Sequence, residues 1–300
     1  MSIVVVGTTA FDSVRTPYGA AEKVLGGSAN YFSMAASFFT SVKMVSVIGE
    51  DFPQDHLEYL ASRNVCTQGI AKLSGRTFHW KGRYERDLSE AETLETHLNV
   101  LEQFKPSLPQ EYRKCDYVFL ANIDPDLQQQ VLEQMENPKI IACDTMNFWI
   151  SRKKDALFQT LKSIDIFMLN ETEARQLSGE SNLIRAAKKI HARGPRIIII
   201  KRGEHGALLY NEGRIFVLSA FPLETVQDPT GAGDTFAGGF MGYLAKSGED
   251  LNDTTLRRAI VYGTVMASFN VEDFSFNRLK TLDWGLIEQR YRSLLNALSF

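Results

Sequence analysis

The chain of 300 residues has a hydrophobic content of 44%, which is enough for the core of one large α/β domain. Its 33 Lys and Arg residues against 36 Asp and Glu residues give a net charge of −3, so the basic excess typical of nucleic-acid-binding proteins is absent. The three cysteines, Cys66, Cys115 and Cys143, form no C-x-x-C pair, which argues against a cysteine metal site and suits a reducing compartment.

The N-terminus, Met1–Gly7, lacks the basic stretch and the long apolar run of a secretory signal. The longest apolar runs, such as Ile197–Ile200, have the length of strands rather than of membrane-spanning helices. We therefore expect a cytoplasmic protein that does not cross a membrane.

The first predicted element is a strand over Ile3–Val6, because a continuous apolar run is typical of a strand buried on both faces of a parallel sheet. The segment Gly7–Asp12 then leaves the carboxyl end of this strand as a loop. Ligands of open α/β sheets bind beyond the carboxyl ends of the strands. Asp12 is therefore a candidate to accept hydrogen bonds from substrate hydroxyl groups; the alternative is a solvated loop carboxylate.

Two adjacent glycines, Gly26 and Gly27, precede a predicted helix that begins near Ser28, a natural N-cap. Glycines allow the backbone to approach a ligand closely. Asn30 and Tyr31 follow in the first turn of this helix.

The stretch Arg76–Tyr84 alternates with a period of two, which predicts a strand after the strand at 42–48 and the helix at 55–63. Phe78, Trp80 and Tyr84 share one face of it. They indicate either a half-buried hairpin with packed aromatic residues or an aromatic surface that faces a ligand.

Strand-like runs at 117–120, 139–142 and 164–169 are separated by helical patterns at about 125–136 and 151–162. This alternation predicts right-handed crossovers and a doubly wound, mostly parallel α/β sheet. Asn122 and Asp144 follow two of these strands, so both are candidates to line a substrate cleft at the carboxyl edge.

Asn170 and Glu173 open the next helix with the spacing of a capping box, which is their structural interpretation. The strand at 196–201 ends in Lys201, either a solvated charge or a phosphate contact. Gly203 and Gly206 then punctuate a turn, and a hairpin follows at 207–217.

The stretch Gln227–Phe240 passes from a turn at Asp228 through Gly-Ala-Gly-Asp into a helix that ends near Gly248. The N–H groups of Gly231, Ala232, Gly233 and Asp234 point toward one place at the positive end of the helix dipole, which predicts an anion hole. An acid there repels a bound phosphate unless it acts as a base on a substrate hydroxyl group. We therefore interpret Asp234 as a general base; the alternative is a helix with an acid in its first turn.

This signature resembles that of the ribokinase-like (PfkB) carbohydrate and nucleoside kinases. The resemblance runs from Gly7 to about Asn270 and implies a ribokinase-like sandwich, with residues 1–300 forming a single domain. It also implies a small β lid inserted around 72–100, which closes over the substrate and often pairs with the lid of a second subunit in a homodimer.

The resemblance further implies roles for single residues. Asp12 and the Gly26-Gly27 loop contact the acceptor, although Tyr31 stands where the family has Asn, and Asn30 comes one position early. The nucleotide site and its ions involve a further set: Asn170 and Glu173 for Mg²⁺ (through water) and phosphate, Lys201, Gly203 and Gly206 for the nucleotide, Asn270 for the adenine side, and Asp228 for a monovalent cation such as K⁺.

These roles predict an ATP-dependent phosphotransferase that phosphorylates a hydroxymethyl group of a small sugar. A nucleoside kinase of the adenosine-kinase type is the first alternative, because Tyr31 and the aromatic face of the lid offer rings on which a base can stack. A non-catalytic sensor of ATP or sugar is the alternative from another class. Asp234 argues against the sensor, because a pure binder gains nothing from an acid facing a phosphate.

Overall fold

The computed structural model describes residues 1–86, 88 and 90–299. A nine-stranded sheet forms its centre, and the order of the strands across it is β13-β12-β11-β10-β9-β8-β1-β4-β5. The bounds of these strands are β1 (Ser2–Val6), β4 (Ser41–Ile48), β5 (Val65–Lys72), β8 (Tyr117–Leu120), β9 (Ile140–Cys143), β10 (Ile166–Asn170), β11 (Ile197–Lys201), β12 (Ala207–Asn211) and β13 (Arg214–Leu218).

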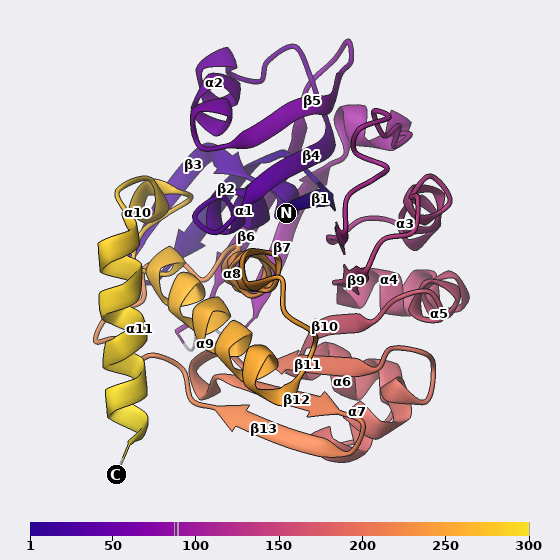
Figure 1. The fold of residues 1–300 in the computed structure, drawn as a ribbon. Helices are drawn as coiled ribbons and strands as arrows, with labels where there is room; N and C mark the ends of the chain where they lie inside the picture. The colour runs from indigo at the N-terminus through magenta and orange to yellow at the C-terminus, as the bar shows by residue number, and fades with distance from the viewer. Residues whose placement is uncertain (87, 89, 300) are drawn as a thin grey trace.

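Neighbouring strands run parallel except at one edge, where β12 is antiparallel to both β11 and β13. The two faces of β1 enter two different cores: Ile3 and Val5 belong to one, Val4 and Val6 to the other. The sheet is therefore covered on both sides, and the predicted doubly wound, mostly parallel fold is confirmed (Figure 1).

Helices lie on both faces of the sheet in Figure 1. The face of Ile3 is covered chiefly by α1 (Ser28–Ala36), α8 (Ala232–Ser247), α9 (Asp253–Asn270) and α11 (Trp284–Leu298). The face of Val4 is covered by α3 (Pro125–Leu132), α5 (Lys154–Leu161), α6 (Glu171–Ser178) and α7 (Leu183–His191). The remaining helices are α2 (Gln54–Ser62), η1 (Asn99–Gln103), α4 (Asn147–Arg152), η2 (Gly203–His205) and α10 (Asn277–Lys280). Within the described ranges no helix combines the length and the apolar character needed to span a membrane.

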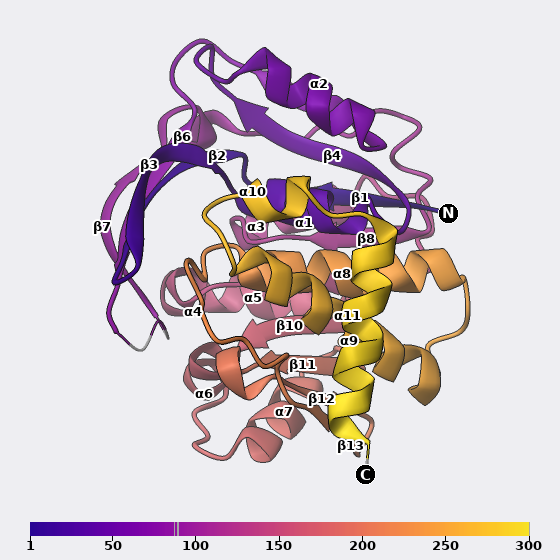
Figure 2. The same ribbon diagram turned by 90° about the vertical axis from the view of Figure 1, so that its left-hand side faces the viewer.

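A second sheet of four strands stands beside the large one and curves along one side of the molecule (Figure 2). Its order is β3-β2-β6-β7, with the bounds β2 (Ala10–Thr16), β3 (Gly19–Gly26), β6 (Phe78–Tyr84) and β7 (Ala91–His97). The expected insertion around 72–100 supplies only two of these strands. The predicted loop over Gly7–Asp12 was wrong, because Asp12 lies within β2 and pairs with Trp80 of β6.

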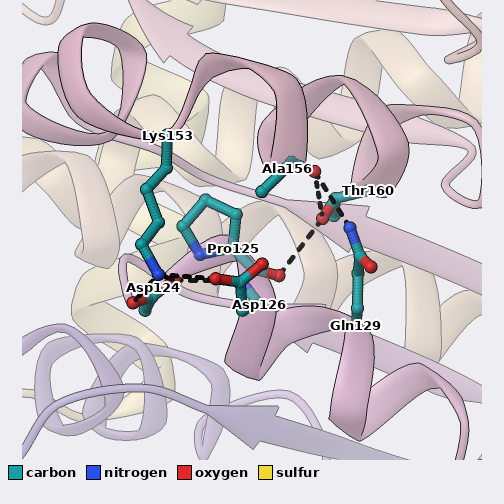
Figure 3. Close-up of polar contacts among 7 residues, drawn as sticks. All are labelled: Asp124, Pro125, Asp126, Gln129, Lys153, Ala156 and Thr160. Atoms are coloured by element: carbon teal, nitrogen blue, oxygen red, sulfur yellow. Dashed lines mark hydrogen bonds and ion pairs between the residues drawn. The ribbon is translucent and has the colours of Figure 1, made fainter.

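The connection between α3 and the α4–α5 pair shows how helices on the second face are held together (Figure 3). Lys153 lies between α4 and α5, and its Nζ is 2.7 Å from Oδ2 of Asp124 and 2.5 Å from Oδ2 of Asp126. Asp124 also caps α3 by accepting the N–H of Asp126. This part-exposed ion pair contains the same residue types as the pair in the site described below.

Candidate active site

Three neighbouring parallel strands end at one edge of the large sheet, facing the beginning of α8. Asp144 directly follows β9, Asn170 ends β10 and Lys201 ends β11. Asn170 and Lys201 are paired in register, which brings the ends of their strands together. Ligands of such sheets usually bind at the carboxyl ends of parallel strands. The carboxyl ends of β9, β10 and β11 therefore form the candidate active site.

The beginning of α8 presents free backbone donors to this edge. Gly231 is its N-cap with φ 74°, a conformation that favours glycine. Among the residues that the structure describes, the amides of Gly231, Gly233 and Asp234 donate to no acceptor. The amide of Ala232 donates to the carbonyl oxygen of Pro229 at 3.1 Å. The free N–H groups at the predicted anion hole are therefore those of Gly231, Gly233 and Asp234, whereas the N–H of Ala232 closes the preceding turn.

Buried polar side chains hold the loop before α8. Asp228 accepts the N–H of Thr230 at 2.9 Å, and Nδ2 of Asn270 donates to the carbonyl oxygen of Thr230 at 2.8 Å. Oδ1 of Asn270 also accepts the hydroxyl group of Thr235 at 3.2 Å. The prediction of Asn270 as an adenine contact is corrected, because its side chain is 1% exposed and its contacts brace the loop.

Asp234 lies in the first turn of α8 and is half-buried. Burial raises its pKa to about 7, with a further increase from Asp144 and an opposing effect from the Lys201 ammonium. A general base works best when its pKa is near the working pH. The environment of Asp234 therefore suits proton abstraction from a hydroxyl group at neutral pH.

Lys201 and Asp144 form an ion pair beside Asp234, with 2.5 Å between Nζ and Oδ2. Burial by itself lowers the pKa of Lys201, but the carboxylates of Asp144 and Glu173 outweigh it, so the net pKa is raised. Lys201 therefore stays protonated and supplies positive charge close to the free amides of α8.

Asn170 and Glu173 form a complete capping box at the start of α6. Oδ1 of Asn170 accepts the N–H of Glu173 at 2.8 Å, and Oε2 of Glu173 accepts the N–H of Asn170 at 2.7 Å. The structural interpretation of this motif is thus observed. Burial raises the pKa of Glu173 to about 8, with further increases from Asp144 and Asp234. The Lys201 ammonium and the hydrogen bond from the Asn170 N–H oppose this increase.

Asp12 and Gly26, the predicted acceptor-binding residues, lie against each other. A Cβ atom at Gly26 would overlap the Asp12 carboxylate, so the carboxylate occupies the space that a side chain would fill. Burial raises the pKa of Asp12 to about 8, with further increases from Asp228 and Asp234. Gly27 has φ 97°, and a Cβ there would lie 2.5 Å from the carbonyl oxygen of Thr8. Gly27 is therefore required at this turn, whereas a side chain at Gly26 would displace the Asp12 carboxylate.

The small sheet places aromatic side chains next to Asp12. Trp80 pairs in register with Asp12, and a Cβ atom at Gly82 would overlap the six-membered ring of Trp80, so the indole lies across Gly82. The indole N–H donates to Oγ1 of Thr93 on β7 at 3.2 Å. The hydroxyl group of Tyr84 lies 3.4 Å from Oγ1 of Thr230, in the loop before α8. The aromatic face of the small sheet thus adjoins both Asp12 and the anion hole.

Tyr31 and Asn30 were predicted to contact the substrate, and the structure corrects both. The Tyr31 side chain is 2% exposed, its ring packs against Gly231 and its centroid is 4.6 Å from that of Phe276. It is therefore unavailable to stack on a base. Asn30 is fully buried and donates to the carbonyl oxygen of Gly26 at 2.8 Å, so it stabilises the glycine turn. Every residue of α1 is buried, which is why its sequence does not reveal a ligand-facing side.

Asn122 does follow a strand at the ligand edge, but its side chain is occupied. Its Oδ1 accepts the indole N–H of Trp149 at 2.9 Å, and its Nδ2 contacts Sδ of Met146 at 3.1 Å. Gly203 and Gly206, with φ 53° and 84°, shape the turn after β11. A Cβ at Gly206 would overlap the carbonyl oxygen of Leu218, so this glycine is required by packing. The sequence predicts Asp144 only as a residue that lines the cleft, whereas the structure pairs it with Lys201.

Comparisons with known proteins agree with this fold. A sequence model described as pfkB family carbohydrate kinase matches residues 1–279. The cytidine kinase of Thermococcus kodakarensis is 30% identical over 247 residues, which cover 80% of this chain and 87% of that protein. The nucleoside kinase of Methanocaldococcus jannaschii, an archaeal member of the ribokinase family, has a similar structure, with a TM-score of 0.76, 18% identity and coverage of 97% and 98% of the two chains. A putative ribokinase II from E. coli in complex with ATP and Mg²⁺ also matches, with a TM-score of 0.76, 19% identity and coverage of 99% of both chains.

Proposed function

We propose a nucleoside as the phosphoryl acceptor of this chain, which belongs to the pfkB family of carbohydrate kinases and is therefore a phosphotransferase with a hydroxyl acceptor. The observation that carries the proposal is the indole of Trp80, which lies across Gly82 on the strand that pairs with Asp12. A flat aromatic surface next to a hydroxyl-binding carboxylate suits a ribose that carries a base. The identity of 30% with a cytidine kinase supports this acceptor over the small sugar that the sequence favoured.

In this proposal each group of the site has one task. Asp12 accepts a hydrogen bond from a ribose hydroxyl group, and Asp234 accepts the proton of the attacking hydroxymethyl group. The free amides of Gly231, Gly233 and Asp234 stabilise the negative charge that develops during transfer. A base with a pKa near 7 at this position favours an enzyme over the non-catalytic sensor considered from the sequence.

The residues at the sheet edge fit ATP and Mg²⁺, because free amides, the part-buried ammonium group of Lys201 and the buried acid of Glu173 adjoin one another. ATP with Mg²⁺ supplies the phosphoryl group when bound. Lys201 would contact the phosphates, and Glu173 would hold Mg²⁺ through water, as suits the reluctance of that ion to lose its hydration shell.

The K⁺ site at Asp228 stays a prediction, because oxygen atoms that could hold the ion already accept hydrogen bonds within the chain. Oδ1 of Asp228 already accepts the N–H of Thr230, and the carbonyl oxygen of Val271 accepts the N–H of Gln227 at 2.8 Å.

A homodimer through the small sheet likewise stays a prediction, and sedimentation analysis of the purified chain tests it.

The acceptor is tested by measuring ADP release with cytidine, inosine and ribose, the last being a sugar without a base. Trp80→Leu is expected to lower kcat/KM for nucleosides by a factor of about 10–100, because base–aromatic stacking contributes about 1–3 kcal/mol. The value for ribose should not change. Tyr18→Leu, an exposed aromatic residue at the β2–β3 turn of the same sheet, is the matched control. If the wild-type chain turns over ribose as fast as nucleosides, the nucleoside proposal is wrong and a small sugar is the acceptor.

Glu173→Gln separates metal binding from helix capping. The amide oxygen of Gln can still accept the N–H of Asn170, so the capping box is kept. We expect the Mg²⁺ concentration for half-maximal activity to rise severalfold while the melting temperature stays unchanged. If Glu173 only caps α6, both the melting temperature and the Mg²⁺ titration should match those of the wild-type chain, because Gln keeps the cap. The Mg²⁺ titration distinguishes the two results, and parallel melting curves check that the cap is kept.

A further inference from the structure

Asp144 is a buried acid to which the proposed reaction gives no task. Its side chain is 4% exposed and both of its oxygens are engaged. Oδ2 lies 2.5 Å from Nζ of Lys201, whose side chain is 17% exposed, and Oδ1 accepts the N–H of Thr145 at 2.8 Å. The carboxylate is therefore held rigidly at the end of β9, pointing toward the end of β11.

Lys201 reaches from β11 to the first turn of α8. A Cβ atom at Gly233 would lie only 3.0 Å from Nζ, so the ammonium group packs against the glycine at the anion hole. Glu173 and Asp234 also act electrostatically on Lys201. The ammonium group of Lys201 is thus surrounded by the carboxyl groups of Asp144, Glu173 and Asp234. The carboxyl group that it contacts is stabilised in its ionised form.

The pairing of Lys201 with Asp144 has a consequence for Asp234. A lysine side chain has a flexible four-carbon stem, so without a fixed partner its ammonium group turns to the nearest available carboxylate. An ion pair with Asp234 would stabilise the ionised form of that acid and weaken it as a base. The contact with Asp144 keeps Nζ at the anion hole and leaves Asp234 free to accept a proton.

We infer that Asp144 is a positioning residue that holds Nζ of Lys201 beside the free amides of α8, where Lys201 contacts the phosphoryl group during transfer. The inference rests on the proposed phosphoryl transfer, but not on which acceptor is used. It predicts that Asp144 acts on the reaction through Lys201 alone.

A double-mutant cycle tests this coupling with Asp144→Asn, Lys201→Met and the variant that carries both changes. Each single change should lower kcat at least tenfold and weaken ATP·Mg²⁺ binding in calorimetry, with the KM for the acceptor within a factor of two of the wild-type value. The double variant should be no slower than Lys201→Met alone, because Asp144 has no task without the lysine. Asp124→Asn, which alters the Lys153 ion pair of Figure 3, is the matched control and should leave kcat and ATP affinity unchanged.

Wild-type kcat and ATP affinity in Asp144→Asn would overturn the inference, as would single effects that multiply in the double variant. Asp144→Asn leaves Lys201 without its partner, and this variant alone could fail to fold. The double variant carries no unpaired charge at this place, so comparing its kcat and ATP affinity with those of Lys201→Met tests the same inference. Failure of the proposed function gives a different result: the wild-type chain would then transfer phosphate to neither nucleosides nor ribose, and the calorimetric titrations would still test Asp144.

Discussion

Replacing Asp234 with Asn is expected to lower kcat by a factor of about 10²–10⁴, the usual loss when a general base is removed. Asn keeps the size of the side chain and its hydrogen bonding, so the first turn of α8 should stay intact. ATP affinity should hold or increase, because a negative charge beside the anion hole is removed. Steady-state assays with the best acceptor and calorimetric titration with ATP measure the two effects.

The pH dependence gives a second signature of the same residue. A base must be deprotonated to act, and burial with the neighbouring Asp144 raises the pKa of Asp234 to about 7. The kcat of the wild-type chain should therefore increase with pH up to about 7 and then level off. This increase should be absent from the residual activity of Asp234→Asn and preserved in Asp250→Asn, an exposed control in the α8–α9 loop. Near-normal turnover by Asp234→Asn would show that another group accepts the proton.

The central strands of the large sheet were predictable because they are apolar on both faces, whereas β5, with its many part-exposed and exposed residues, was not predicted. Runs such as Ile197–Ile200 pack against helices on either side, so burial leaves a continuous sequence signal. The first half of the small sheet gave no such signal. The segment Ala10–Thr16 carries Asp12, Ser13 and Arg15, whose polar side chains obscure its strand character. Its partner β6 was recognised because Phe78, Trp80 and Tyr84 alternate with a period of two.

The candidate site was predictable where a residue follows a strand or opens a helix, as Lys201, Glu173 and Asp234 do. Contacts across the chain were not. The ion pair between Asp144 and Lys201 joins residues 57 positions apart, and only the order of β9, β10 and β11 brings them together. Tyr31 failed for the opposite reason: its position beside the glycine turn suggested a ligand contact, while the packing of Gly231 on its ring assigns it to the core.

Gly26 has no side chain, and this leaves room for the carboxylate of Asp12, the proposed acceptor-binding group. The space beside its Cα is filled by the Asp12 carboxylate, and Asp12 supplies all three of the nearest atoms that an added Cβ would meet. Gly26→Ala must therefore displace the Asp12 carboxylate, the proposed acceptor-binding group, while the first turn of α8 is untouched. The substitution thus separates acceptor binding from nucleotide binding within one site.

We expect Gly26→Ala to raise the KM for the acceptor by a factor of about 10–100, because a hydrogen bond to a charged group contributes about 1.5–3 kcal/mol. ATP affinity should stay at the wild-type value. Asp12→Ala is the matched background: it loses the same contact, and adding Gly26→Ala to it should cost nothing more, since the overlapping carboxylate is gone. Multiplying effects in the double variant, or an unchanged acceptor KM in Gly26→Ala, would show that Asp12 does not hold the acceptor from this position.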